Sequence, residues 1–138
     1  MMRHALAVAL LAMPLATAAA PEVEPGLGWL HGEWTGTGTL QGQPTKVTLS
    51  VAPAFGGTAT TLAYRAQMPS AVFEGRATYR IKAKGRVEGQ WTDSAGSLHI
   101  VGGRIEGTGM TTVWGSPATE IGRSTYKLDK GTLSTSDA

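Results

Sequence analysis

Apolar and polar residues alternate with a period of two along most of this chain. The longest uninterrupted example lies between Phe73 and Lys82, where apolar or small residues occupy the odd positions and charged or polar residues the even ones. Successive side chains of a β-strand point to opposite faces, so this pattern predicts a strand with one buried and one solvated face. Beyond the first twenty residues, no useful length of sequence has the 3.6-residue period of an amphipathic helix. The chain is therefore expected to be all-β.

Turn signals divide the chain into short strands. Clusters of glycine, proline and aspartate recur about every ten residues, which is the spacing of a sandwich or a barrel. The clusters that we interpret as turns lie at 41–44, 53–57, 68–70, 83–85, 93–96, 115–117 and 129–131. Leu98 and Ile100 are assigned to the inner face of a short strand that ends before Gly102. Residues 104–114 are assigned to a separate, long run of strand residues that follows the glycine pair. We predict a single antiparallel up-and-down barrel of eight or nine strands, preceded by a short turn or 3-10 segment.

The stretch from Leu27 to Leu40 is predicted to begin this barrel. It consists of a short apolar turn that stops at Gly32, followed by a strand whose first inward residue is Trp34. Glycines follow the tryptophan on the same face and leave room beside it. We expect Trp34 to plug the closed end of the barrel.

The triplet Gly32-Glu33-Trp34 resembles the glycine-any-tryptophan motif that opens the first strand of lipocalins and their calycin relatives. The chain is most similar to small exported lipocalin-like proteins of bacteria and, more distantly, to nitrobindin-like haem barrels. The resemblance implies a lipocalin-like domain over residues 27–138. It also implies that Arg123, on a late strand, packs across the ring of Trp34 as a structural contact.

The first twenty residues have the organisation of a secretory signal peptide. A short basic start is followed by an apolar run from Ala5 to Leu15 and by small residues that lead to a cleavage site after Ala18 or Ala20. We expect residues 1–20 to be removed, residues 21–26 to form an extended leader, and the protein to be exported, either to the periplasm or as a secreted protein. The chain contains no cysteine, which excludes disulfides and thiolate chemistry.

The charges of the expected mature chain are nearly balanced. Without Arg3 it has eleven Lys and Arg against ten Asp and Glu, and these alternate along the strands without forming a block. This distribution predicts no nucleic-acid partner. Charged residues on the polar faces of the strands also predict no stable membrane insertion, because a transmembrane barrel needs an apolar outer face.

Recognisable catalytic and metal-binding motifs are absent from the sequence. It has no nucleophile elbow, no zinc-binding helix motif and no phosphate loop. The carboxylates fall mostly on the outward parity, and His31 and His99 are interpreted as surface groups. We predict no metal and no cofactor. Catalysis is not expected, although the sequence leaves an enzymatic role open.

The candidate site is the inside of the barrel. An eight-stranded barrel has room for one small ligand when its interior residues are small, and several inward positions here are glycine or alanine. The residues predicted to line a pocket for a small hydrophobic molecule are Leu62, Tyr64, Phe73, Tyr79, Trp91 and Thr111. The alternative is that the aromatic members of this set fill a solid core.

Three functions are open at this point. The first is binding of a small hydrophobic molecule inside the barrel, and the second is a ligand-free interaction or envelope-maintenance module. The third, implied by the more distant resemblance, is haem binding in a nitrobindin-like barrel. The oligomeric state is open as well: if the last strand, around Leu133, is incomplete, the edge of the first strand is exposed and two copies are expected to pair through it.

Overall fold

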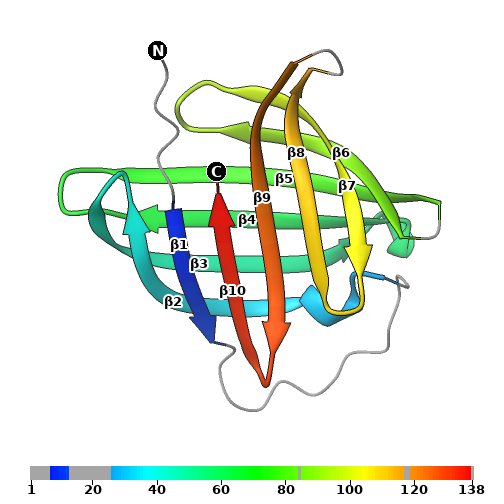
Figure 1. Cartoon of the computed structure of the whole chain (residues 1–138), viewed down its shortest axis with the longest axis horizontal. Coiled ribbons are helices and arrows are strands. Elements are labelled where there is room, and N and C mark those ends of the chain that lie inside the picture. Colours follow the sequence, from blue (N-terminus) through cyan, green and yellow to red (C-terminus); the bar gives the residue numbers. More distant parts are fainter. Residues whose placement is uncertain (1–6, 13–25, 84, 117–118, 138) are drawn as a thin grey trace.

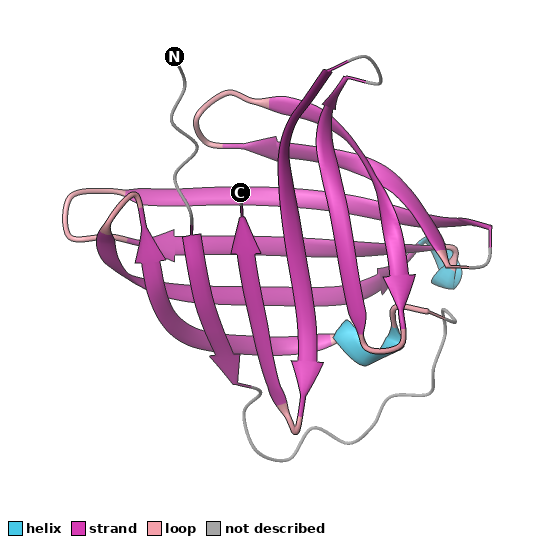
Figure 2. Ribbon diagram, in the orientation of Figure 1, coloured by secondary structure: helices cyan, strands magenta, loops and turns pink. Residues whose placement is uncertain are grey.

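The chain forms an antiparallel β-barrel, seen in a computed structural model that describes residues 7–12, 26–83, 85–116 and 119–137 (Figure 1). Strands make up nearly all of the described chain (Figure 2). They are β1 (Ala7–Ala12), β2 (Gly32–Leu40), β3 (Gln43–Ala54), β4 (Ala59–Gln67), β5 (Val72–Ala83), β6 (Arg86–Asp93), β7 (Leu98–Glu106), β8 (Gly109–Ser116), β9 (Thr119–Asp129) and β10 (Thr132–Asp137). Two short 3-10 helices, η1 (Gly28–Leu30) and η2 (Phe55–Gly57), accompany the strands in these ranges. None of the described helices is long and apolar enough to cross a membrane.

Strands β2 to β10 form an up-and-down meander in which each strand pairs antiparallel with the next along the chain. This nine-stranded meander confirms the predicted fold class. Strand β1 pairs with both β10 and β2 and closes the ring (Figure 1). It belongs to the segment that we interpret as a signal peptide, whose other residues, 1–6 and 13–20, lie outside the described ranges, as do residues 21–25 of the expected leader.

The predicted alternation is visible in the burial of the strands. On β3, Val47, Leu49 and Val51 are at most 3% exposed, whereas the residues between them are exposed or half-buried. The inward side chains of opposite walls meet in one apolar core. Burial of these side chains is the main contribution to stability in a chain that has no disulfide.

Helix η1 closes one end of the barrel. Leu27 and Leu30, at the two ends of this turn, are fully buried. The indole Nε1 of Trp34 donates a hydrogen bond of 2.9 Å to the carbonyl oxygen of Leu30 and so holds the turn against the first strand of the meander. Gly32 lies between them with φ of 139°, a backbone conformation that disfavours residues with a side chain. The predicted plug at the closed end is therefore built from the turn together with Trp34.

The prediction for residues 98–114 was wrong in the position of the turn. Strand β7 continues through the glycine pair at 102–103, and the chain turns at Gly107 and Thr108. Gly107 has φ of 57°, which suits a tight turn, whereas neither Gly102 nor Gly103 has a positive φ. Glycine content alone did not distinguish a glycine needed for a turn from one needed for close packing of strands.

The inward face of β7 was also predicted wrongly. Val101 is 3% exposed and pairs with Gly89 and Trp114, so the odd residues of this strand face the interior. Leu98 and Ile100 are instead 66% and 57% exposed. This order of faces puts the side chain of His99 on the inner side of the barrel, in contrast to the surface position that we expected.

Candidate ligand cavity

A cavity of about 300 Å³ lies inside the barrel. Its lining comes from the end of β2, the start of β5, the turn between β6 and β7, and the end of β10. In an up-and-down barrel these positions lie at the end remote from η1, which precedes β2. The barrel is thus filled at one end and hollow towards the other.

Aromatic rings form much of the cavity wall. Tyr64 and Phe73 pack edge to face with ring centroids 6.2 Å apart, and Trp91 lies 6.2 Å from Tyr64 and 6.5 Å from Phe73. The ring of His99, which lies directly across from Trp91 on the neighbouring strand, packs against that of Trp114 with the centroids 5.1 Å apart. Such rings present large apolar surfaces and carry polar groups at their edges.

Two glycines provide space for the tryptophans. A Cβ atom at Gly75 would collide with the six-membered ring of Trp91, and one at Gly122 would collide with the corresponding ring of Trp114. Gly122 is the direct cross-strand partner of Trp114, whereas Gly75 lies opposite Asp93, two residues beyond Trp91 on β6. Each indole therefore lies flat against a glycine in the adjacent strand, as a lining of the wall.

Tyrosine hydroxyls and one carboxyl group form a polar part of the lining. The hydroxyl groups of Tyr79 and Tyr126 are hydrogen-bonded to each other, and Ser124 Oγ donates a hydrogen bond of 2.7 Å to Asp137 Oδ1. Burial raises the pKa of Tyr64 to about 12 and that of Tyr79 to about 12, and the nearby Asp137 adds to both shifts. Burial likewise raises the pKa of Asp137, partly offset by the hydrogen bond from Ser124. The tyrosine hydroxyls therefore stay protonated at neutral pH.

A second carboxylate, that of Asp93, is committed to local structure. Its Oδ2 accepts a hydrogen bond of 2.8 Å from Trp91 Nε1. Its Oδ1 accepts hydrogen bonds of 3.0 and 3.1 Å from the backbone nitrogens of Ala95 and Ser97. Asp93 therefore fixes both the orientation of one tryptophan and the turn at the cavity mouth.

Four of the six residues predicted to line a pocket do so: Tyr64, Phe73, Tyr79 and Trp91. The other two lie elsewhere. Leu62 is 1% exposed and packs in the apolar core. Thr111 lines a groove on the outside of the barrel, because Thr112 is the buried, inward residue at this point of β8.

Arg123 also lies on the outside. The neighbouring Gly122 and Tyr126 are buried, and Arg123 is exposed on the opposite face of β9, whereas Trp34 is buried inside the barrel. Arg123 and Trp34 thus lie on different faces of the wall, in contrast to the arrangement implied by the resemblance. The register of β9 determines this outcome, since it directs every second residue inward.

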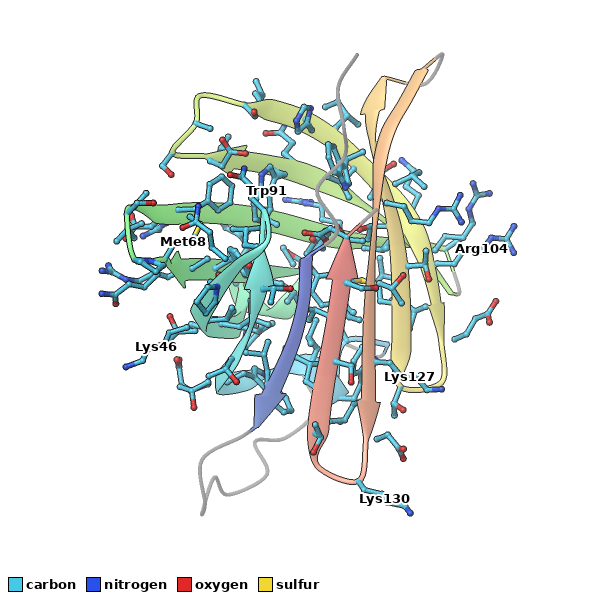
Figure 3. All side chains as sticks on the ribbon, turned by 60° about the vertical axis from the view of Figure 1, so that its left-hand side comes forward. Lys46, Met68, Trp91, Arg104, Lys127 and Lys130 are labelled. Carbon is cyan, nitrogen blue, oxygen red and sulfur yellow. The ribbon has the colours of Figure 1, made fainter. Side chains whose placement is uncertain are left out.

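The outer groove, with a volume of about 1040 Å³, gathers basic residues that are far apart in the sequence. Figure 3 shows Arg104 and Lys127 pointing away from the barrel. Arg86 lies directly opposite Arg104 across β6 and β7. The groove is also lined by Lys82 and Arg123, and by two acidic residues, Glu88 and Glu106. Lys82 Nζ and Glu88 Oε1 lie 3.4 Å apart, so the groove contains an ion pair as well as the other basic residues.

The sequence interpretation missed His99, Trp114, Ser124, Tyr126 and Asp137 as lining residues. His99 could have been placed inside the barrel from its spacing of two residues from the apolar Val101, because residues two apart on a strand share a face. Asp137 lies on the same face of β10 as the buried Leu133, but this strand has no other apolar residue that would mark the inner face. In the part of the chain that the structure describes, no three His, Cys, Asp or Glu residues are grouped as a metal site would require.

Comparisons with known proteins add no further assignment. No family model, no curated protein and no solved structure matches this chain. The function must therefore be inferred from the barrel and its cavity.

Proposed function

We propose that this protein is an exported, lipocalin-like barrel that binds a small, largely apolar molecule in the cavity. The observation that carries the proposal is the hollow itself. The end of the barrel next to η1 is filled by side chains such as Leu27, Leu30 and Trp34, whereas about 300 Å³ remain between aromatic rings towards the other end. Known ligand sites are mostly apolar cavities with a few polar groups, which is the composition found here.

The size of the cavity restricts the ligand. Ligand pockets range from roughly 300 to 1,000 Å³, so this cavity is at the lower limit. A molecule with one or two rings is expected to fit, and a long-chain lipid is not. The tyrosine hydroxyls and Asp137 would orient its polar end.

The proposal is tested by titrating the purified protein with the uncharged, two-ring probe naphthalene while recording naphthalene and tryptophan fluorescence. We expect saturable binding to the wild type. Val101→Phe adds a ring at a residue that is 3% exposed and lines the cavity, and is expected to weaken binding at least tenfold by filling the space. Ile100→Phe is the matched control, since it adds the same ring to the adjacent, 57% exposed residue.

Circular dichroism of each variant verifies that the barrel is folded. Absence of saturable binding to the wild type would refute the proposal. So would equal affinity of the folded Val101→Phe and Ile100→Phe variants, because the bound probe would then lie outside the cavity.

A further inference from the structure

The charges that face the cavity are of one sign. Its lining contains two carboxyl groups, those of Asp93 and Asp137, and no lysine or arginine of the described chain. The basic residues of the surrounding strands point outward, as Arg104 and Lys127 do (Figure 3). An anionic ligand such as a fatty acid would meet no cation inside the barrel, and its carboxylate would be desolvated without compensation.

Only one of the two carboxyl groups is available to a ligand. Both oxygens of Asp93 accept hydrogen bonds from the protein. Asp137 accepts one hydrogen bond, from Ser124 Oγ to Oδ1, and its Oδ2 accepts none from the described residues. A partly buried carboxylate oxygen without a donor is costly, and a ligand that donates to it removes this cost.

The surroundings of Asp137 suit a positive charge. Tyr64, Tyr79 and Tyr126 line the same cavity as Asp137. The carboxylate of Asp137 adds to the burial that raises the pKa of each tyrosine hydroxyl. The ring of Tyr64 continues into the packed group with Phe73 and Trp91. Aromatic faces attract organic cations, and the attraction increases when water is excluded.

We propose that the ligand is a small aromatic or aliphatic amine, whose ammonium group donates hydrogen bonds to Asp137 while its apolar body lies among the aromatic rings. This inference rests on the proposed function and specifies the class of ligand. A protonated amine supplies the donor that Asp137 lacks and the positive charge that the lining does not contain. A charge-assisted hydrogen bond of this kind is stronger than one between neutral groups.

The amine should bind more weakly in acid. Burial raises the pKa of Asp137, so its carboxylate is lost at a higher pH than that of an exposed aspartate. The groups that face it are the hydroxyls of Ser124, Thr135 and the three tyrosines, with Asp93 and His99 elsewhere in the lining. The tyrosines stay neutral across the acidic range. Amine affinity is therefore expected to fall as the pH is lowered, whereas the affinity of a neutral analogue should depend much less on pH.

The test uses three probes of similar shape: 2-phenylethylamine, 2-phenylethanol and 3-phenylpropionate. Their dissociation constants are measured at pH 7.5 by isothermal titration calorimetry. We expect the amine to bind at least tenfold more tightly than the alcohol, and the carboxylate to bind least. Asp137→Asn should remove the preference for the amine and leave the affinity for the alcohol within about twofold. Asp129→Asn, in an exposed position at the end of β9, is the matched control and should change neither.

The outcomes separate this inference from the proposed function. If the alcohol or the carboxylate binds as tightly as the amine, the inference fails and the cavity remains a ligand site. If the preference for the amine survives in the folded Asp137→Asn variant, the assignment of Asp137 fails. If none of the three probes and no neutral apolar probe binds, the proposed function fails together with the inference.

Discussion

Adjacent glycines on β7 should respond in opposite ways to the same substitution. A Cβ atom on Gly103 would lie 2.9 Å from Thr112 Cα and 3.0 Å from the carbonyl carbon of Thr111, with the Thr111 oxygen closer still. All three atoms belong to the backbone of the neighbouring strand, which cannot rotate away as a side chain can. At Gly102 the nearest atom would be the Val87 oxygen at 4.0 Å, which is an open position.

The expected magnitudes follow from these distances. Gly103→Ala forces the two strands apart, at a cost of about 1–3 kcal/mol for overpacking, and weakens one or two ladder hydrogen bonds of about 1 kcal/mol each. Alanine restricts the unfolded backbone more than glycine does, which stabilises the folded state of either variant by about 0.4–1 kcal/mol. We therefore expect Gly103→Ala to lower the free energy of unfolding by about 2–4 kcal/mol. Gly102→Ala should raise it by about 0.5 kcal/mol, since only the unfolded-state effect remains.

Urea unfolding followed by tryptophan fluorescence measures both values. The two variants should share the m-value of the wild type, so that a change in midpoint reports stability alone. In a thermal scan the melting temperatures of the pair should differ by roughly 10–18 °C, at about 4 °C per kcal/mol for a domain of this size. Equal stability of Gly103→Ala and Gly102→Ala would show that β7 and β8 do not approach each other closely at residue 103.

Two further predictions concern Asp137 and β1. Because burial raises the pKa of Asp137 above 3.8, its protonated form is favoured by folding, and the stability that it contributes is present below pH 3.8 and lost as the pH rises through the raised pKa. Asp137→Asn should therefore be more stable than the wild type at pH 7, and this difference in stability should disappear near pH 3. Urea unfolding at both pH values measures the difference. A variant less stable than the wild type at pH 7 would contradict the prediction. A chain of residues 21–138 lacks β1, whose Leu11 is fully buried, and should lose about 1.5–3 kcal/mol for this side chain alone. This shorter chain also exposes the edges of β2 and β10, so we expect it to form a dimer, which light scattering would detect. A monomer as stable as the full chain would show that the two edges pair with each other instead.

The parts of the fold that could be predicted are those where alternation and turn residues agree. On β3 and β5 every inward position is apolar, glycine or threonine, so the periodic pattern alone determined their faces. On β7 the outward residues Leu98 and Ile100 are more apolar than the inward His99, and the pattern indicated the wrong face. Only the pairing of Val101 with neighbouring strands determines the face there, and pairing is a property of the folded barrel.

The sequence left a cavity and a solid core open as alternatives, and the residues proposed as cavity lining were only partly those that line it. Tyr64, Phe73, Tyr79 and Trp91 lie on strands with regular alternation and were identified. Asp137 lies at the end of a strand with a single buried apolar residue, Leu133, so no periodicity marks its inner face. The groups that would determine which ligand binds are polar residues at strand ends, and hydrophobic patterns carry little information about such residues.

The two glycine and tryptophan pairs explain why the barrel is hollow where it is. A glycine inside a strand costs roughly 0.5–1 kcal/mol relative to alanine, so the inward glycines lower stability unless another contact compensates. Gly75 and Gly122 are each covered by an indole ring, which restores apolar burial at that point. Both rings form part of the cavity lining beside the glycines that they cover. The cavity thus depends on where glycines face tryptophans across neighbouring strands, and a barrel of the same length with alanine at these two positions would have to turn both rings inward and close the proposed site.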